Sequence, residues 1–179
     1  DNRFTKVIVI GHSEGSLIGM MAAKNGNADE YISIAGVGES ADKTLKRQLA
    51  SIPQQGRDTA YKIIDSLVAG KTVGHVDPML YSLFRPSVQP YMISWFKYNP
   101  AVEISKLTIP VLILQGTNDI QVTVDDAKKL SGGDKAAKLV LLENMNHIFR
   151  VVEGDRQANI ATYSNPNLPI DPKLVTSIS

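Results

Sequence analysis

The chain has 179 residues, 43% of them hydrophobic and 21% charged, which suffices for one domain with its own hydrophobic core. Its formal net charge of +1 gives no indication of a nucleic-acid-binding surface. The absence of cysteine excludes disulfides, thiolate nucleophiles and cysteine-ligated zinc, but does not indicate a compartment. No apolar run approaches the roughly 20 residues that span a bilayer, so no membrane span is expected.

The first part of the sequence predicts a strand, a helix and a second strand. Lys6–Ile10 is a short β-branched run, typical of a strand buried on both faces of a parallel sheet. Apolar residues at helical spacing predict a helix from Ser13 to about Asn25. Tyr31–Ala35 predicts the second strand. Such a unit is right-handed by default, with its two strands parallel.

Residues 39–107 contain no predicted strand. Helices are expected over Ala41–Ser51, Asp58–Ala69 and Gln89–Tyr98, and the third is expected to end at a following proline. This long helical stretch predicts an insertion over the carboxyl edge of the sheet, where ligands bind in open α/β sheets.

The rest of the chain returns to alternating strands and helices. Ile109–Leu114 and Ala137–Leu142 predict strands, Val124–Leu130 a helix between them, and Pro172 the start of a final helix. The predicted fold class is therefore α/β, with a parallel sheet of about four strands. The predicted division is a core of residues 1–38 and 108–179 and a helical cap of residues 39–107.

The motif G-x-S-x-G occurs once, as Gly11-His12-Ser13-Glu14-Gly15. It follows a predicted strand and precedes a predicted helix, which is the context of a nucleophile elbow. There a sharp turn presents the serine hydroxyl above the sheet, flanking small residues avoid clashes, and the Glu14 backbone N–H faces a developing oxyanion. The alternative is that Ser13 only caps the helix, and a bare motif of this kind arises often by chance.

Candidates for a general base and its orienting acid follow the last two predicted strands. Asp119 lies after the strand Ile109–Leu114, and His147 lies after the strand Ala137–Leu142. Because the carboxyl ends of parallel strands meet at one sheet edge, Ser13, Asp119 and His147 are expected to lie together. A hydroxyl nucleophile at neutral pH requires such a base and acid.

Other candidates for these roles rank lower. Asp125 is the second choice for the acid, because it falls on the helix after the loop. His12 is expected to pack beneath the elbow, and His75 to lie in the insertion. Histidine and acidic residues show no metal-ligand spacing, so neither a metal nor another cofactor is expected. In the insertion, Trp95 and Phe96 are the candidates for an apolar substrate pocket, against the simpler expectation that they only pack the cap.

The elbow, the loop Gly116–Asp119 and the pair Asn146-His147 together resemble the α/β-hydrolase superfamily. The branch looks like the serine-aminopeptidase-like hydrolases, which include bacterial esterases and monoacylglycerol-lipase-like proteins. The resemblance implies that Lys6–Ile10 is the family's fifth strand and that residues 39–107 are its cap. It also implies four earlier strands, with an oxyanion-hole donor in the loop after the third, which this sequence does not contain. We therefore expect a complementing N-terminal segment, or a second chain, to cover the exposed sheet edge.

The expected function is that of a serine hydrolase, a carboxylesterase that cleaves a small-molecule ester through an acyl-enzyme. Ser13 is the expected nucleophile, His147 the base and Asp119 the acid. Two alternatives stay open at this point. One is an amide or peptide hydrolase, and the other is a non-catalytic module derived from a hydrolase. The sequence indicates neither the substrate nor the oligomeric state.

Overall fold

The computed structural model describes residues 3–179 and divides into two compact units. Unit 1 comprises the described residues up to Gly38 together with Pro100–Ser179, and unit 2 comprises Glu39–Asn99. Each unit has its own secondary structure and core. Within residues 3–179, no helix combines the length and the apolarity needed to cross a membrane.

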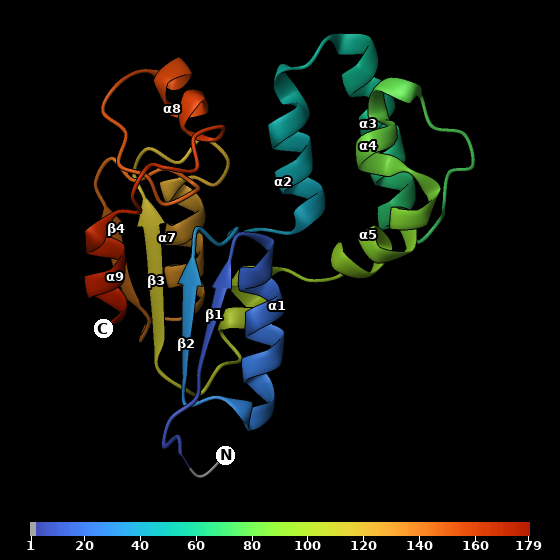
Figure 1. The fold of residues 1–179 in the computed structure, drawn as a ribbon. Helices are drawn as coiled ribbons and strands as arrows, with labels where there is room; N and C mark the ends of the chain where they lie inside the picture. Colours follow the sequence, from blue (N-terminus) through green and yellow to red (C-terminus); the bar gives the residue numbers. More distant parts are fainter. Residues whose placement is uncertain (1–2) are drawn as a thin grey trace. The chain divides into compact units, whose positions relative to one another are not determined.

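Unit 1 is built on one parallel sheet of four strands (Figure 1). The strands are β1 (Ile8–His12), β2 (Glu30–Ile34), β3 (Val111–Gly116) and β4 (Lys138–Leu142). They pair in the order β1-β2-β3-β4. The predicted α/β class and four-stranded parallel sheet are therefore confirmed. All four carboxyl ends meet at the same edge of the sheet.

The strands differ in burial. Every residue of β3 is buried, as expected for a strand between two neighbours in a sheet covered by helices. β1 departs from its prediction, because Ile8 and Ile10 are 40% and 50% exposed. Among the described residues β1 pairs with β2 alone, so one of its edges has no ladder partner. An apolar sequence identified the strand, but its burial depends on its neighbours.

Three predicted helices of unit 1 are present: α1 (Glu14–Ala22), α7 (Val124–Gly133) and α9 (Pro172–Ile178). A π-helical turn, η1 (Ala23–Asn27), continues α1 to about the predicted end. Side chains of β2 show that α1 and α9 cover opposite faces of the sheet, since successive side chains alternate. Tyr31 and Ser33 bond Ser16 of α1, whereas Ile32 and Ile34 pack with Leu174 of α9.

Two short helices of unit 1 were not predicted. One is α6 (Pro100–Ile104), which begins at the proline that is expected to end the preceding helix. The other is α8 (Arg156–Thr162), a segment without an apolar stripe, capped at its N-terminus by the Asp155 side chain. Since α6 packs against α1 and α7, residues 100–107 group with the sheet. The structural boundary therefore falls after Asn99 and not after Leu107.

Unit 2 is helical, with no strand among its described residues. Its α-helices are α2 (Ala41–Gln48), α3 (Gln54–Val68), α4 (Tyr81–Phe84) and α5 (Gln89–Trp95). Single turns of 3₁₀-helix join them: η2 (Leu49–Ser51), η3 (Pro78–Leu80) and η4 (Pro86–Val88). The predicted helical character of this segment is correct, although α3 begins earlier and α5 ends earlier than predicted.

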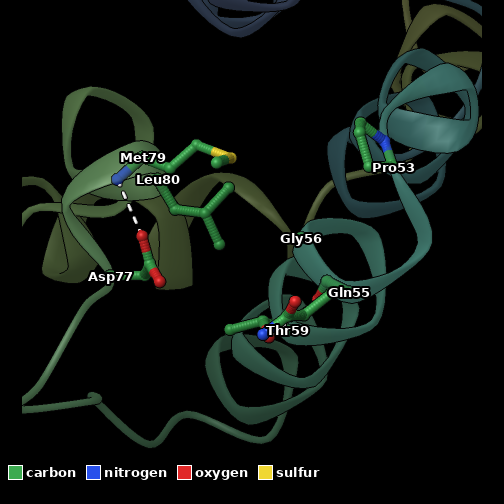
Figure 2. A pocket seen from close by; sticks show the side chains of 7 residues that line it. All are labelled: Pro53, Gln55, Gly56, Thr59, Asp77, Met79 and Leu80. Atoms are coloured by element: carbon green, nitrogen blue, oxygen red, sulfur yellow. Dashed lines mark hydrogen bonds between the residues drawn. The ribbon is translucent and has the colours of Figure 1, made fainter.

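Unit 2 has its own apolar core, which includes Ile64, Leu67, Phe84 and Phe96. A cavity of about 190 Å³ lies at the surface of this unit (Figure 2). Its lining comes from the start of α3 and from η3, namely Pro53, Gln55, Gly56, Thr59, Asp77, Met79 and Leu80. Trp95 and Phe96 are not among these lining residues. Phe96 is 8% exposed within the core, and Trp95 packs beside it. Their role in a substrate pocket stays a prediction.

Candidate active site

Ser13 has the backbone of a sharp strand-to-helix turn. It lies between β1 and α1 with φ 56° and ψ −123°, a region that costs a non-glycine residue about 1–3 kcal/mol. Its backbone N–H donates to the Ile34 carbonyl at 3.0 Å, which fixes the turn to the next strand. Ser13 occupies the N-cap position of α1, but its hydroxyl makes no capping hydrogen bond. The structure therefore leaves that hydroxyl available for another partner.

The two glycines of the motif have different roles. A Cβ on Gly11 would lie 2.3 Å from the Gly15 carbonyl oxygen and 2.7 Å from the Ser16 Cα, so only glycine fits. A Cβ on Gly15 would meet nothing within 4 Å in the described structure. The expectation that small residues on both sides avoid clashes is therefore right for Gly11 and wrong for Gly15. The turn brings the backbone of α1 against β1 on the Gly11 side alone.

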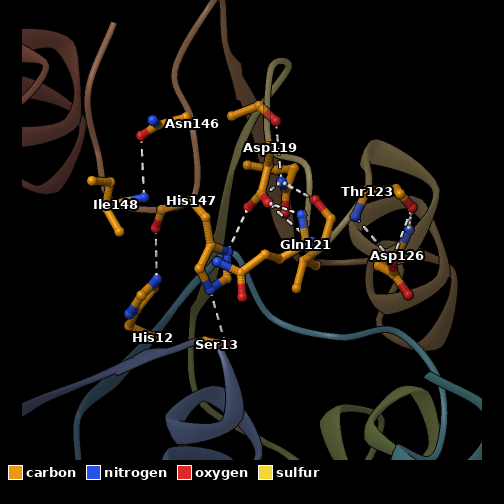
Figure 3. Close-up of polar contacts among 12 residues, drawn as sticks. His12, Ser13, Asp119, Gln121, Thr123, Asp126, Asn146, His147 and Ile148 are labelled. Atoms are coloured by element: carbon orange, nitrogen blue, oxygen red, sulfur yellow. Dashed lines mark hydrogen bonds and ion pairs between the residues drawn. The ribbon is translucent and has the colours of Figure 1, made fainter. Parts of the chain in front are cut away.

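The structure brings Ser13, His147 and Asp119 into one hydrogen-bonded chain (Figure 3). His147 Nε2 lies 3.1 Å from Ser13 Oγ, and His147 Nδ1 lies 2.8 Å from Asp119 Oδ2. The carboxylate accepts a hydrogen bond only from a protonated Nδ1. In the neutral imidazole, Nε2 is then the acceptor and faces the serine hydroxyl. Three segments separated widely in sequence thus present a hydroxyl, an imidazole and a carboxylate that are connected by hydrogen bonds.

Asp119 is held in place from several directions. Its side chain is 1% exposed, and its Oδ1 accepts the backbone N–H groups of Gln121 and Val122 at 2.8 and 2.9 Å. The buried Gln115 amide donates to Oδ2 at 3.3 Å, beside the bond from His147. Four donors therefore converge on this carboxylate. The carboxylate is therefore fixed in orientation and faces the imidazole through Oδ2.

Asp125, the second choice for the acid, lies elsewhere. It is on α7, its side chain is 79% exposed, and it pairs with Lys128 at 3.3 Å. Its neighbour Asp126 forms the capping box of this helix with Thr123, also drawn in Figure 3. Asp119, and not Asp125, is therefore the carboxylate that contacts His147.

His12 contacts the loop that carries His147, which the sequence did not indicate. Its Nε2 lies 3.0 Å from the His147 carbonyl oxygen, and its ring lies 4.8 Å from that of His147 and 4.6 Å from that of Phe149. Since a carbonyl only accepts, His12 Nε2 carries the proton and donates. Burial lowers the pKa of His12, and the neighbouring His147 lowers it further. His12 thus connects β1 to the loop that carries His147, as a neutral imidazole.

Glu14 follows the serine at the first position of α1. Its side chain is half-buried, and this burial raises the pKa of its carboxyl group. Its backbone N–H lies at the N-terminal end of a helix, where the helix dipole favours negative charge. Donation from this N–H to an oxyanion stays a prediction.

Within residues 3–179, no group of three or more His, Cys, Asp or Glu side chains is arranged to hold a metal ion. His75, expected in the insertion, lies in unit 2 outside its helices. His147 contacts the Ser13 hydroxyl, and His12 and Asp119 each contact His147.

Several residues of the site were missed from the sequence. Gln115 interrupts an apolar strand, and a polar residue in such a run was an available signal. Asn146 stabilises the loop that carries His147, because its Oδ1 accepts hydrogen bonds from the backbone N–H groups of Ile148 and Arg150. Asn159 lies in α8 and gave no signal, because its partners are far away in sequence.

The chain is similar in sequence to one esterase and in structure to several solved proteins. No family model matches the chain. Esterase EstD of Thermotoga maritima is 26% identical over 154 residues, which are 84% of this chain and 37% of EstD. Est1E from Butyrivibrio proteoclasticus is a solved structure with a TM-score of 0.50 and 20% identity, matched over 89% of this chain and 58% of its own. A meta-cleavage product hydrolase from Pseudomonas fluorescens IP01 is a solved structure with a TM-score of 0.50 and 14% identity. The match covers 90% of this chain and 65% of that hydrolase chain.

The chain thus spans about a third of EstD and about three fifths of the two solved structures. The likeness to the solved structures concerns the fold, and it extends over most of the described residues. Four parallel strands, flanking helices and a sharp turn at Ser13 between the first strand and the first helix agree with it. The chain therefore carries part of the α/β-hydrolase fold.

Proposed function

We propose that this chain supplies the nucleophile, base and acid of a serine hydrolase that cleaves carboxylic esters. The observation that supports the proposal is the pair of contacts made by His147. Its Nε2 lies 3.1 Å from Ser13 Oγ, and its Nδ1 lies 2.8 Å from Asp119 Oδ2. Structural serines at helix N-termini use their hydroxyls as caps, and Ser13 does not. Its hydroxyl instead has a base within hydrogen-bond reach, and that base has an orienting acid.

In the first half of the reaction, Ser13 Oγ attacks the ester carbonyl carbon and its proton moves to His147 Nε2. Asp119 holds the imidazole in the tautomer with Nδ1–H and stabilises the imidazolium that forms. The Glu14 backbone N–H stabilises the negative oxygen of the tetrahedral intermediate. The bond to the leaving alcohol then breaks, and the alcohol oxygen takes the proton from His147. The acyl group is left as an ester on Ser13.

In the second half, His147 removes a proton from a water molecule, which attacks the acyl carbon. The bond to Ser13 Oγ breaks, and Oγ recovers the proton from His147. The products are a carboxylic acid and the free serine. The two halves use the same three groups and need no oxidant or reductant.

The comparisons support an ester over other acyl substrates. EstD is an esterase by name, and it matches most of this chain in sequence. The branch suggested by the sequence also contains amide and peptide hydrolases. We assign the ester because EstD, a relative that is 26% identical over most of this chain, bears that name.

Ser13→Ala is the direct test of the nucleophile. We expect turnover of p-nitrophenyl acetate and butyrate, and labelling by a fluorophosphonate probe, to be lost. Ser66→Ala, at a partly exposed serine in unit 2 whose hydroxyl donates to the Lys62 carbonyl, is the matched control and should retain both. Labelling that persists in Ser13→Ala would refute the assignment of the nucleophile. A protein that is folded but unlabelled with Ser13 intact would support a non-catalytic module.

Matched substrates separate ester from amide hydrolysis. The p-nitroanilide of the same acyl group as the best p-nitrophenyl ester should be cleaved far more slowly. Equal or faster cleavage of the anilide would favour the amide hydrolase.

A further inference from the structure

Helix α8 carries a buried amide that the proposed reaction does not use. Asn159 is 0% exposed, although the other residues of this short helix are mostly exposed. Burying an amide is unfavourable unless its donors and acceptor find partners. The partners of Asn159 are therefore the first indication of its role.

Asn159 contacts two different loops. Its Nδ2 donates to the Asn118 carbonyl oxygen at 2.6 Å, and its Oδ1 accepts from Asn146 Nδ2 at 3.3 Å. Asn118 directly precedes Asp119, and Asn146 directly precedes His147. One side chain thus holds the residue before the acid and the residue before the base.

Further hydrogen bonds connect the same elements. Asn146 Nδ2 also donates to Thr162 Oγ1 at 2.8 Å, one turn along α8 from Asn159. The Asn118 backbone N–H donates to the Met145 carbonyl at 3.1 Å, and its side-chain amide donates to the Val152 carbonyl at 2.9 Å. The two loops and α8 therefore form one hydrogen-bonded network, with Asn159 as the side chain that bonds both loops at once.

The loop that carries His147, between Asn144 and Phe149, depends on these hydrogen bonds because its backbone is strained. Asn144 and Phe149, on either side of His147, have φ of 60° and 66°, in the left-handed region that favours glycine. Strained segments persist only where the surrounding structure over-determines them. The bonds from α8 help to supply that constraint next to the base.

We propose that Asn159 is a positioning residue that sets the relative placement of Asp119 and His147. The proposal rests on the function proposed above. Asn159 acts through the backbone of Asn118 and the side chain of Asn146. A displacement of about 1 Å in a catalytic group can lower turnover about 10²-fold, so a small shift of either loop would be measurable.

Two substitutions test this proposal in the full protein. Asn159→Ala removes both contacts, and Asn159→Asp keeps the acceptor towards Asn146 but places a carboxylate oxygen against the Asn118 carbonyl. Asn167→Ala changes an exposed asparagine of the same segment and is the control. For each variant, kcat and KM are measured over pH 5–9 at temperatures well below its melting point. The low-field proton NMR signal of the His147–Asp119 hydrogen bond is recorded in parallel.

We expect both Asn159 variants to lose roughly 10- to 100-fold in kcat with little change in KM. The pH midpoint assigned to His147 should shift, and its low-field signal should move or broaden. Asn167→Ala should match the unmodified protein in every readout. A purely structural role would lower the melting temperature of the Asn159 variants but leave the pH profile and the NMR signal unchanged, and that result would overturn the proposal.

The NMR measurement also separates this proposal from the proposed function. If the unmodified protein hydrolyses no ester and takes up no fluorophosphonate, the function fails, while the effect of Asn159 on the His147–Asp119 bond is still decided by the signal. If the unmodified protein is active and both variants retain its kcat, pH profile and signal, the function stands and the positioning role is refuted.

Discussion

Replacing Asp119 by asparagine tests the tautomer on which the proposed reaction depends. Both backbone donors, from Gln121 and Val122, bond Oδ1, whereas His147 Nδ1 bonds Oδ2. The asparagine oxygen should therefore take the Oδ1 position, where it keeps two hydrogen bonds. Its NH₂ group is then left at the Oδ2 position, facing the imidazole. The reverse orientation would set this NH₂ against two N–H donors.

An NH₂ group beside His147 Nδ1 reverses the proton distribution of the imidazole. Nδ1 becomes the acceptor, and the proton resides on Nε2, which faces Ser13 Oγ at 3.1 Å. Nε2 then donates to the hydroxyl and cannot accept its proton. For a serine, histidine and aspartate arranged in this way, the same substitution lowers kcat by about 10⁴-fold. At about 1.36 kcal/mol for each factor of ten, the barrier rises by about 5 kcal/mol.

The assay compares Asp119→Asn with the unmodified protein in p-nitrophenyl ester hydrolysis and in the rate of fluorophosphonate labelling. Asp125→Asn, at the exposed acid on α7, is the matched control and should change kcat by less than twofold. The ¹⁵N chemical shifts of the His147 ring report the tautomer independently of turnover. A loss of less than tenfold, or an unchanged tautomer in Asp119→Asn, would refute this reasoning.

Three further predictions concern the elbow, its histidine and the core beneath it. Gly11→Ala should lower the free energy of unfolding in urea by about 1–3 kcal/mol, because the new Cβ meets the Gly15 carbonyl. Gly15→Ala should leave the free energy of unfolding unchanged or raise it by about 0.5–1 kcal/mol. Equal effects of the two substitutions would contradict the structure. Because the pKa of His12 is lowered in the folded state, the unfolded chain binds the extra proton, and stability should fall as pH drops below about 6.5. His12→Phe should reduce this slope between pH 5 and 7.5, and an unchanged slope would remove His12 as its source. Burial raises the pKa of Tyr31 from 10.0 to about 12, so stability should be intact below pH 10 and decline by up to about 3 kcal/mol as pH rises to 12, since the unfolded chain ionises first. Absorbance at 295 nm follows the ionisation, and Tyr31→Phe should abolish this part of the decline.

Local patterns in the sequence identified the elements around the proposed nucleophile. The β-branched run before Gly11 predicted β1, and the motif that follows predicted the turn to α1. The runs near residues 111–116 and 138–142 predicted β3 and β4, so Asp119 and His147 could be placed at strand ends. Parallel strands then require all three groups to lie at one sheet edge, and for this step the sequence was sufficient.

Weak or ambiguous patterns were predicted less well. Helix α8 has no apolar stripe, and α6 begins at a proline that is equally typical of a helix end and a helix start. The burial of β1 was predicted wrongly, because burial depends on neighbours and an apolar sequence does not specify them. Gly15 was assigned a steric role by its motif, and the structure shows open space beside it.

The sequence by itself determined the fold class, the parallel sheet and the three residues proposed to act on a substrate. Hydrophobic periodicity and glycine placement are local properties, and they suffice for these. Only the tertiary structure decided which groups support that chemistry. The Gln115 amide on Asp119, the His12 imidazole on the His147 carbonyl and the Asn159 amide between two loops all join residues distant in sequence. Such contacts depend on the packing of whole elements, which no local pattern encodes.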